Sequence, residues 1–465
     1  MTVTALTDVL LLDDVAALRE RLDGDVVTPR DPGWDDARAA WNLAVDQRPL
    51  AVVFAASAED VVEVVDHARI RGITVAPQGT GHFAPARGSV DGSILLRTDR
   101  MRAVSIDPEA GIARAEAGVL WQEVADAAAE HGLAALAGSS ADVGVVGYTL
   151  GGGMGWMARR YGLAANSVVA VELVTPDGRH VRADAENEAD LFWAVRGGGG
   201  SFGVVTALEF RLYPVSEIYA GVMFWPVERA AEILGAWREW VDTVPDEVTS
   251  LGRLMHFPPL PDFPEHVRGR SFAIVETAIL GSEDEAARLL QPLRDLDPEM
   301  DTVATIPASR LSEVHMDPPH PVPGAGDGGF LADFTPDAIQ ALVDVAGGGS
   351  ETPLLSIEVR HLGGMLAEPS PEHGAVGTID AGFAFFSVGA AMTPEMGAAV
   401  GAAAGGVRTA LAPWLAGRTY FNFTERRTGG GDLYGASTYR RLREIKAQVD
   451  PQELLRVAHP ISPAA

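Results

Sequence analysis

The chain has 465 residues, of which 47% are hydrophobic, and this length predicts two or three domains with apolar cores. Asp and Glu outnumber Lys and Arg by 64 to 36, so the net charge is −28. This balance argues against a nucleic-acid partner, because such partners bind basic surfaces. There are no cysteines, which excludes disulfides, thiolate catalysis, zinc–thiolate sites and iron–sulfur clusters. Residues 1–20 lack the basic start of a signal peptide, and no long apolar run follows. We therefore expect a cytoplasmic protein without a membrane partner.

The first half of the chain alternates short strands and helices. An amphipathic helix is expected at 9–22. Strands at 51–54 and 73–76 enclose a helix that begins after Ser57 and ends at Gly72, and this βαβ unit leads directly into the loop 79–82. The further segments expected in this half are strands at 93–96, 104–106, 112–116, 168–174, 179–183 and 204–212, and helices at 120–131 and 190–195.

Three glycine-rich loops lie in this half, at 79–82, 138–155 and 196–203. Glycine lets the backbone turn tightly and present N–H groups to an anion. Glycines in an apolar setting also let the backbone press against a flat ligand. The three loops therefore predict one pocket for a flat, phosphate-bearing ligand, with His82 as a nucleophile beside it.

The hydrophobic pattern of the sequence changes near residue 217. Strands alternate with amphipathic helices there, which predicts a sheet covered by helices on one face. A loop rich in Pro and Gly at 318–329 is expected to be a lid. The expected strands are 218–224, 272–279, 354–362 and 383–390, the expected helices are 227–241, 283–296, 336–345 and 394–411, and a strand at 418–423 and a helix at 438–449 end the chain.

Two short motifs suggest other enzyme classes. Residues 79–84 fit the G-x-G-x-x-A dinucleotide pattern, but Pro85 and Gly88 argue against the helix that this pattern requires. Residues 199–203 fit the G-x-S-x-G nucleophile elbow, but a helix precedes them and a strand follows, which inverts the required order. His315 and His320 are expected in a loop near solvent, and no close histidine pair on one helix exists, so no metal site is expected.

The ordered set of motifs resembles the FAD-linked oxidases of the vanillyl-alcohol oxidase / p-cresol methylhydroxylase (PCMH) superfamily, in particular the berberine-bridge-enzyme-like branch. The matching stretches are Trp41–Asn42, Gly79–His82, Leu150–Trp156, Asp190–Thr206, Tyr420–Phe423 and Tyr439–Leu455. The resemblance implies an α+β fold with a two-part PCMH-type FAD-binding domain and a substrate domain whose antiparallel sheet is covered by helices. The expected domains are an FAD-binding domain at 1–216 (core about 46–215), a substrate domain at 217–415, and a C-terminal segment at 416–465 that returns to the FAD-binding domain.

The resemblance implies an FAD cofactor bonded covalently to His82. A neutral imidazole nitrogen can add to the electrophilic 8α methylene tautomer of the flavin; the alternative is a histidine that only hydrogen-bonds a phosphate or the ring edge. Many relatives carry a second link from a cysteine in Cys-Pro-Thr-Val-Gly, which is impossible here because the matching run is Ser140–Gly144. The residues expected to contact the cofactor are Gln78, Gly79, Thr80, Gly81, His82, Ser140, Val143, Gly144, Gly147, Gly151, Gly152, Gly153, Gly203, Val205 and Asn422.

Three residues are expected to take part in catalysis. Tyr420 matches a tyrosine that helps to deprotonate a substrate hydroxyl, and its phenol, with a pKa near 10, needs a positive or hydrogen-bonding neighbour to act as a base. Glu358 and Arg360 lie on one face of an expected strand. If that face meets the flavin, Glu358 would be a base and Arg360 would support its anion; the alternative is solvated or ion-paired charges. Val143 matches an oxygen-gating position, which favours dioxygen as the electron acceptor.

The predicted function is therefore an FAD-dependent oxidase, a monomer or homodimer, with a small-molecule substrate and dioxygen as partners. It would transfer a hydride from a substrate alcohol, a sugar or a natural-product hydroxyl, to flavin N5, and dioxygen would reoxidise the flavin to give hydrogen peroxide. An amine oxidase resembling 6-hydroxynicotine oxidase is the alternative enzyme. A flavin-binding protein that sequesters a ligand without turnover, and a carbohydrate-binding or scaffold protein, are the alternatives from other classes.

Overall fold

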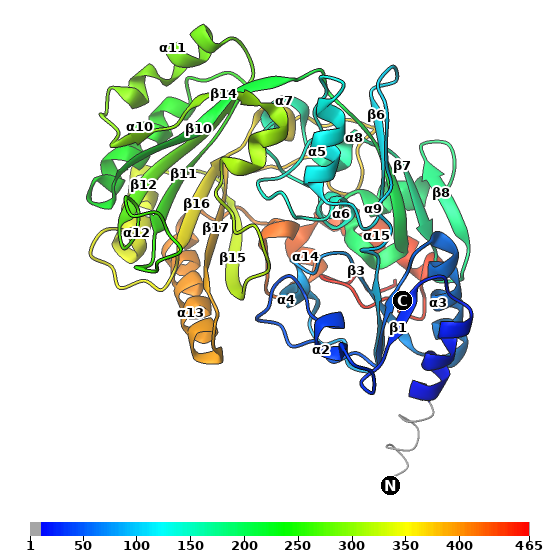
Figure 1. Ribbon diagram of the computed structural model, residues 1–465. Helices are drawn as coiled ribbons and strands as arrows, with labels where there is room; N and C mark the ends of the chain where they lie inside the picture. The colour runs from blue at the N-terminus through cyan, green and yellow to red at the C-terminus, as the bar shows by residue number, and fades with distance from the viewer. Residues whose placement is uncertain (1–10, 465) are drawn as a thin grey trace.

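The computed structural model describes residues 11–464. The first residues of the helix expected at 9–22 lie outside this range. Within it, residues 11–16 are helical and η1 (Ala17–Glu20) continues them. Figure 1 shows a large sheet with its helices on one side of the molecule and two smaller sheets on the other.

The first small sheet delivers the loop that carries His82. Its strands, in sheet order, are β1 (Asp25–Val27), β2 (Ala51–Phe54), β4 (Ser93–Arg97) and β3 (Thr74–Gln78); the last three are parallel. α3 (Ala58–Arg71) connects β2 to β3. Its first turn is capped by the Ser57 hydroxyl, which accepts a hydrogen bond from the Asp60 N–H, and Gly72 ends it at φ 68°. The expected βαβ unit is present, with β4 inserted between its two strands.

The second small sheet is antiparallel and packs against helices from both ends of the chain. Its strands are β5 (Val104–Asp107), β6 (Ile112–Glu116), β9 (Val204–Arg211), β7 (Val168–Val174) and β8 (His180–Asp184), and the nearby helices are α5 (Trp121–Ala129), α6 (Val145–Leu150), α9 (Ala189–Gly198) and α15 (Ala436–Val449). In Figure 1, α15 lies beside α9, and Leu442 of α15 shares a core with Phe202. Leu455 then forms a parallel bridge with Val75 of the first sheet. The last part of the chain is therefore packed into the fold of the first half.

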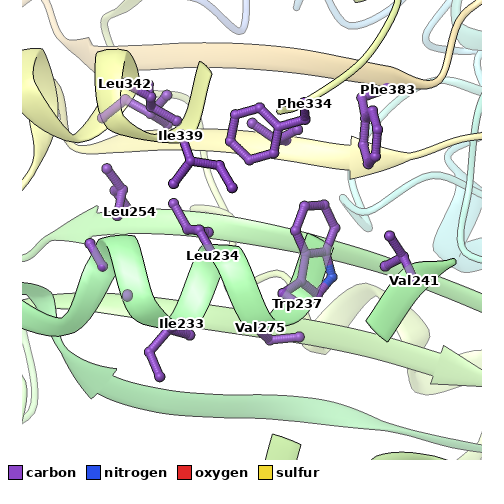
Figure 2. Close-up of a cluster of buried hydrophobic side chains, with 14 of the residues drawn as sticks. Ile233, Leu234, Trp237, Val241, Leu254, Val275, Phe334, Ile339, Leu342 and Phe383 are labelled. Atoms are coloured by element: carbon purple, nitrogen blue, oxygen red, sulfur yellow. The ribbon is translucent and has the colours of Figure 1, made fainter. Parts of the chain in front are cut away.

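The large sheet is antiparallel and carries its helices on one face. Its strands are β13 (Met300–Asp301), β10 (Glu217–Pro226), β12 (Ser271–Ile279), β11 (Val248–His256), β16 (Ser356–His361), β17 (Phe383–Ala390) and β15 (Gly324–Leu331), with β14 (Ala304–Pro307) also paired to β10; the helices are α10 (Ala230–Val241), α11 (Glu283–Arg294), α12 (Pro336–Ala346) and α13 (Pro394–Ala410). Figure 2 shows Trp237 of α10 close to Phe334 and Phe383 in the core between sheet and helices. This arrangement confirms the expected α+β fold with helices over an antiparallel sheet.

Three segments differ from the sequence-based expectations. The expected lid at 318–329 runs into β15, which pairs with β17 along its length. Its glycines suggested a loop, but a Cβ at Gly328 would lie 2.3 Å from the Phe385 carbonyl oxygen, so glycine here permits close strand pairing. β11 was not expected, because Gly252 and Arg253 interrupt its apolar pattern. In place of the strand at 418–423, the chain forms η7 (Phe421–Phe423).

Candidate active site

The loop after β3 holds His82 between three side chains. The Thr80 hydroxyl lies 2.7 Å from His82 Nδ1, and Asp142 Oδ1 lies 3.4 Å from Nε2. The Trp41 indole stacks on the imidazole with ring centroids 4.0 Å apart and 18° between the planes. Trp41 also donates its indole N–H to Asp142 Oδ2. The imidazole is therefore fixed in orientation, and about a fifth of its side chain stays exposed.

Three of the predicted cofactor-binding glycines leave space beside the backbone. A Cβ at Gly147 would meet nothing within 4 Å, and at Gly79 and Gly144 its nearest neighbours would lie 3.8 and 3.7 Å away. None of the three has a positive φ. Neither packing within residues 11–464 nor backbone conformation therefore requires glycine at these positions, so the space is available to a ligand.

The other predicted glycines are explained by contacts within the protein. A Cβ at Gly151 would lie 1.9 Å from Asn422 Oδ1, and one at Gly153 would lie 2.5 Å from a ring carbon of Tyr148. Gly152 has φ 113° and faces Tyr420, and a Cβ at Gly203 would lie 2.6 Å from Leu173. A close neighbouring side chain or a turn is therefore enough to explain each of these glycines. They do not need a flavin against their backbone, as the sequence had led us to expect. Gly81, at φ 88°, faces Ala40 in the same way.

Of the remaining predicted cofactor residues, two make side-chain hydrogen bonds and two pack in a hydrophobic core. Gln78 is buried; its Oε1 accepts from Arg87, and its Nε2 has no partner in the described part of the chain. Ser140 donates its hydroxyl to the carboxylate of Asp317. Val205 lies in the core beneath the second sheet, and Val143 packs at the edge of that core.

The buried Tyr420, the partly buried Tyr148 and an asparagine lie together beside the 151–153 turn. Asn422 donates from Nδ2 to the Tyr148 carbonyl oxygen at 3.0 Å and reaches the Tyr420 hydroxyl at 3.4 Å. Burial raises the pKa of Tyr420 well above its ordinary value, although the nearby Arg360 guanidinium and hydrogen bonds from Gly153 N–H and Asn422 act to lower it. Burial also raises the pKa of Tyr148, whose hydroxyl has no hydrogen-bond partner among residues 11–464. Sequence reasoning missed Tyr148, which lies three residues before Gly151.

The side chains of β16 show which face of the strand is turned away from the helices. Ile357 and Val359 belong to the core under the helices, so Ser356, Glu358 and Arg360 lie on the opposite face. Arg360 donates to both Glu358 oxygens, at 2.9 and 3.2 Å, and its guanidinium lies 5.1 Å from the Phe423 ring centroid. Arg360 therefore lies beside Phe423, close to Tyr420 and Asn422.

Glu358 is poorly suited to be a base. Burial alone would raise its pKa, but Arg360 and His315 hold that pKa well below its ordinary value. His315 Nε2 lies 3.1 Å from Glu358 Oε2. A carboxylate that is paired on both oxygens and strongly ionised has little affinity for a proton. The ion-paired interpretation of Glu358 fits this geometry, and a role as base does not.

His315 lies at the centre of a buried charge network, so the expectation that it is a loop histidine near solvent is wrong. Its Nδ1 lies 2.6 Å from Glu276 Oε2, and Glu276 also accepts from Arg253 at 2.8 Å. Burial and Arg253 oppose a charge on His315, but Glu276, Asp317 and Glu358 outweigh them and raise its pKa to about 9. A single histidine in a Met- and Pro-flanked loop carries no sequence signal for this role. His320 is exposed, as expected. Within residues 11–464 no cluster of three or more acidic or histidine side chains could hold a metal ion.

Comparisons with known proteins show which families the chain resembles. An FAD binding domain model matches residues 49–184, and a berberine and berberine-like model matches residues 419–462. An uncharacterized FAD-linked oxidoreductase of Bacillus subtilis, YvdP, is 29% identical over 462 residues, which cover 96% of this chain and 99% of that protein. Glucooligosaccharide oxidase of Sarocladium strictum is 33% identical over 224 residues, 47% of this chain and 45% of its own length.

Solved structures share the fold over nearly the whole chain. The crystal structure of 6-hydroxy-D-nicotine oxidase from Arthrobacter nicotinovorans has a TM-score of 0.82 at 24% identity and covers 95% of this chain and 98% of its own. A structure of glucooligosaccharide oxidase from Acremonium strictum, described with a 6-S-cysteinyl, 8α-N1-histidyl FAD, has a TM-score of 0.81 at 22% identity and covers 97% of this chain and all of its own. At these identities the likeness establishes the fold.

The fold, the site and the matched domains define an FAD-linked oxidoreductase. Within that class, residues 419–462 are similar to the berberine and berberine-like proteins. The structure fits the cofactor: His82 offers a nucleophilic ring, Gly79 and Gly147 leave room beside their backbone, and Gln78 Nε2 is a buried donor without a partner in the described range. A second, cysteinyl link cannot form, because the sequence has no cysteine. No helix within residues 11–464 is long and apolar enough to cross a bilayer.

Proposed function

We propose that the protein is an oxidase of a substrate alcohol, a sugar or a natural-product hydroxyl. When bound, FAD supplies a two-electron acceptor that takes hydride from the substrate carbon at N5 and is reoxidised by dioxygen. The observation that carries the proposal is the position of the Tyr420 hydroxyl, 3.4 Å from Asn422 Nδ2 and near enough to the Arg360 guanidinium for that cation to lower its pKa. An alcohol must lose its hydroxyl proton while its carbon is oxidised, and this group of side chains can receive it.

Tyr420 is the proposed proton acceptor. Burial raises the pKa of this phenol and keeps it protonated near neutral pH, so it must be helped to carry negative charge. Arg360 supplies a fixed cation, and the N–H groups of Gly153 and Met154 together with Asn422 hydrogen-bond the phenol oxygen. Glu358 orients Arg360 through their ion pair, and His315 in turn contacts Glu358. Neither of these two residues is the proposed proton acceptor. We therefore assign Tyr420 and Arg360 to catalysis and Glu358 to positioning.

The carbon chemistry is tested with Tyr420→Phe. For an alcohol substrate, loss of the proton acceptor is expected to lower kcat by about 10²–10⁴-fold with a smaller change in KM. The flavin spectrum serves as the control, because the phenylalanine keeps the packing with Phe330 and Phe423. Unchanged kcat in the variant would contradict the assignment.

Substrate class is decided by anaerobic bleaching of the bound flavin. We expect alcohols or sugars to bleach it and amines to leave it oxidised. Bleaching by amines alone, retained in Tyr420→Phe, would support an amine oxidase instead, and a flavin that no compound bleaches would support a sequestering protein. Both a glucooligosaccharide oxidase and a 6-hydroxy-D-nicotine oxidase are similar to this chain, so the screen should include both compound classes.

We also infer that His82 bonds the flavin 8α carbon and that the cofactor lies along Gln78–His82 and Gly144–Gly147. The exposed, oriented imidazole and the space beside Gly79 and Gly147 support this inference. Acid precipitation is the test: covalent flavin stays in the pellet, and free flavin in the supernatant would rule the bond out.

The proposed domain division places the FAD-binding domain at 1–216, the substrate domain at 217–415 and a returning segment at 416–465. The start of the large sheet at Glu217, directly after the last strand of the small sheets ends at Arg211, supports the first boundary. Limited proteolysis of the holoprotein, with cleavage mapped by mass spectrometry, tests it.

A further inference from the structure

We infer that Asp142 activates His82 for its attachment to the flavin, as a positioning residue and proton acceptor. The inference rests on the proposed covalent bond at His82. The carboxylate meets the imidazole at one ring nitrogen, Nε2, and Thr80 meets it at the other, Nδ1. No other carboxylate in the described chain lies within 4 Å of either His82 nitrogen.

The carboxylate of Asp142 is held in place from two directions. Its Oδ2 accepts the Trp41 indole N–H, while the same indole stacks on the His82 ring. The backbone on either side is fixed as well, because the carbonyls of Ala141 and Val143 accept hydrogen bonds from the N–H groups of Gln122 and Trp121 at 3.1 and 3.0 Å. The backbone N–H of Trp41 donates to the Thr80 carbonyl oxygen at 2.9 Å. Asp142, Trp41 and the His82 loop therefore form one braced unit.

Asp142 sets the protonation pattern of the imidazole. Burial acts to raise its pKa, but the neighbouring His82 imidazole and the hydrogen bond from Trp41 lower it, so the carboxylate is ionised at neutral pH. An ionised carboxylate at Nε2 favours the tautomer with its proton on that nitrogen. The lone pair then lies on Nδ1, where the Thr80 hydroxyl can donate to it and later release it. Nδ1 is therefore the nucleophilic atom.

The attachment step balances as follows. A bond forms between His82 Nδ1 and the flavin 8α carbon, and that carbon gives up one hydrogen as a proton. The imidazole gives its Nε2 proton to Asp142, which prevents a positive charge from being trapped on the ring. The electron pair of the broken C–H bond reduces the flavin by two electrons. Dioxygen removes these electrons, together with two protons, as hydrogen peroxide.

The chain offers matched variants for a test. Asp142→Asn keeps an oxygen that can accept from Trp41 but cannot take a proton, and Asp142→Glu keeps the carboxylate. Asp142→Ala leaves a partly exposed gap that added formate can enter, since about a fifth of the Asp142 side chain is exposed. His82→Ala is the control without a nucleophile.

The experiment follows attachment in time. Each apoprotein is mixed with FAD in air, samples are acid-precipitated, and the flavin in the pellet is measured and mapped to the His82 peptide by mass spectrometry. We expect attachment in Asp142→Asn to be about 10²-fold slower or more, with non-covalent FAD still bound, and both Asp142→Glu and formate with Asp142→Ala to restore it in part.

The outcomes separate the two proposals. Wild-type protein without flavin in the pellet would overturn the His82 bond itself. Covalent wild-type protein with an equally fast Asp142→Asn variant would overturn only the role of Asp142. Should Asp142→Asn fail to fold or to bind FAD, formate rescue of Asp142→Ala decides the matter, because a purely structural role would not respond to a small carboxylate.

Discussion

The buried charge network around His315 predicts a loss of stability at alkaline pH. His315 is held between Glu276 and Glu358, with Arg253 also against Glu276, and its pKa is raised to about 9. A group whose pKa is higher in the folded than in the unfolded state stabilises the fold while it is protonated. That contribution is complete below its ordinary pKa of about 6.5 and is lost as the pH rises through 9.

The magnitude follows from the two pKa values. A shift from about 6.5 to about 9 corresponds in full to a contribution on the order of 3 kcal/mol. At about pH 7.5, part of this advantage is already lost, and about 2 kcal/mol remains; near pH 9.5 almost none is left. The window between these two pH values is informative because other histidines are neutral there in the unfolded chain.

The assay is denaturant unfolding of the holoprotein, followed by tryptophan fluorescence at both pH values. Wild-type protein is expected to lose about 2 kcal/mol of unfolding free energy between them. His315→Gln is expected to be less stable than wild type at about pH 7.5, because it leaves two carboxylates without their shared cation, and to lack this pH-dependent loss. Equal losses in the two proteins would refute the assigned protonation of His315.

Other consequences follow from single positions. Gly147→Ala is expected to keep the stability of the apoprotein but to weaken FAD binding by about ten- to a hundredfold, measured by titration in a His82→Ala background, because its Cβ enters the open space in which we place the cofactor. Gly153→Ala is expected to destabilise the apoprotein by about 1–3 kcal/mol in denaturant unfolding, because its φ is 75° and its Cβ would overlap a tyrosine ring. Burial raises the pKa of Glu425 to about 7, although the Gly326 N–H acts to lower it, so its contribution to stability is present below pH 4.5 and lost as the pH rises through 7. Glu425→Gln should therefore gain stability relative to wild type at pH 8 and not at pH 4.5; an equal change at both would contradict the shift.

The sequence by itself determined the features that depend on local chemistry. The absence of cysteine rules out a second flavin link in any fold. Ser57 and Gly72 mark the two ends of a helix because they satisfy its free backbone groups. The ordered set of motifs predicted the cofactor class through its resemblance to the FAD-linked oxidases, and the FAD binding domain match at 49–184 confirms that class. Alternation along residues 356–360 placed Glu358 and Arg360 on one face, without saying which face was turned inward.

Only the tertiary structure decided which distant residues meet. Trp41, His82 and Asp142 come from three separate parts of the chain, and His315 becomes a buried cation because Glu276 and Glu358 arrive from two different strands. Local pattern specifies how a segment turns and which side it buries. The protonation of a side chain depends instead on desolvation and on charges within a few ångströms, and the packing of the whole chain brings those charges together.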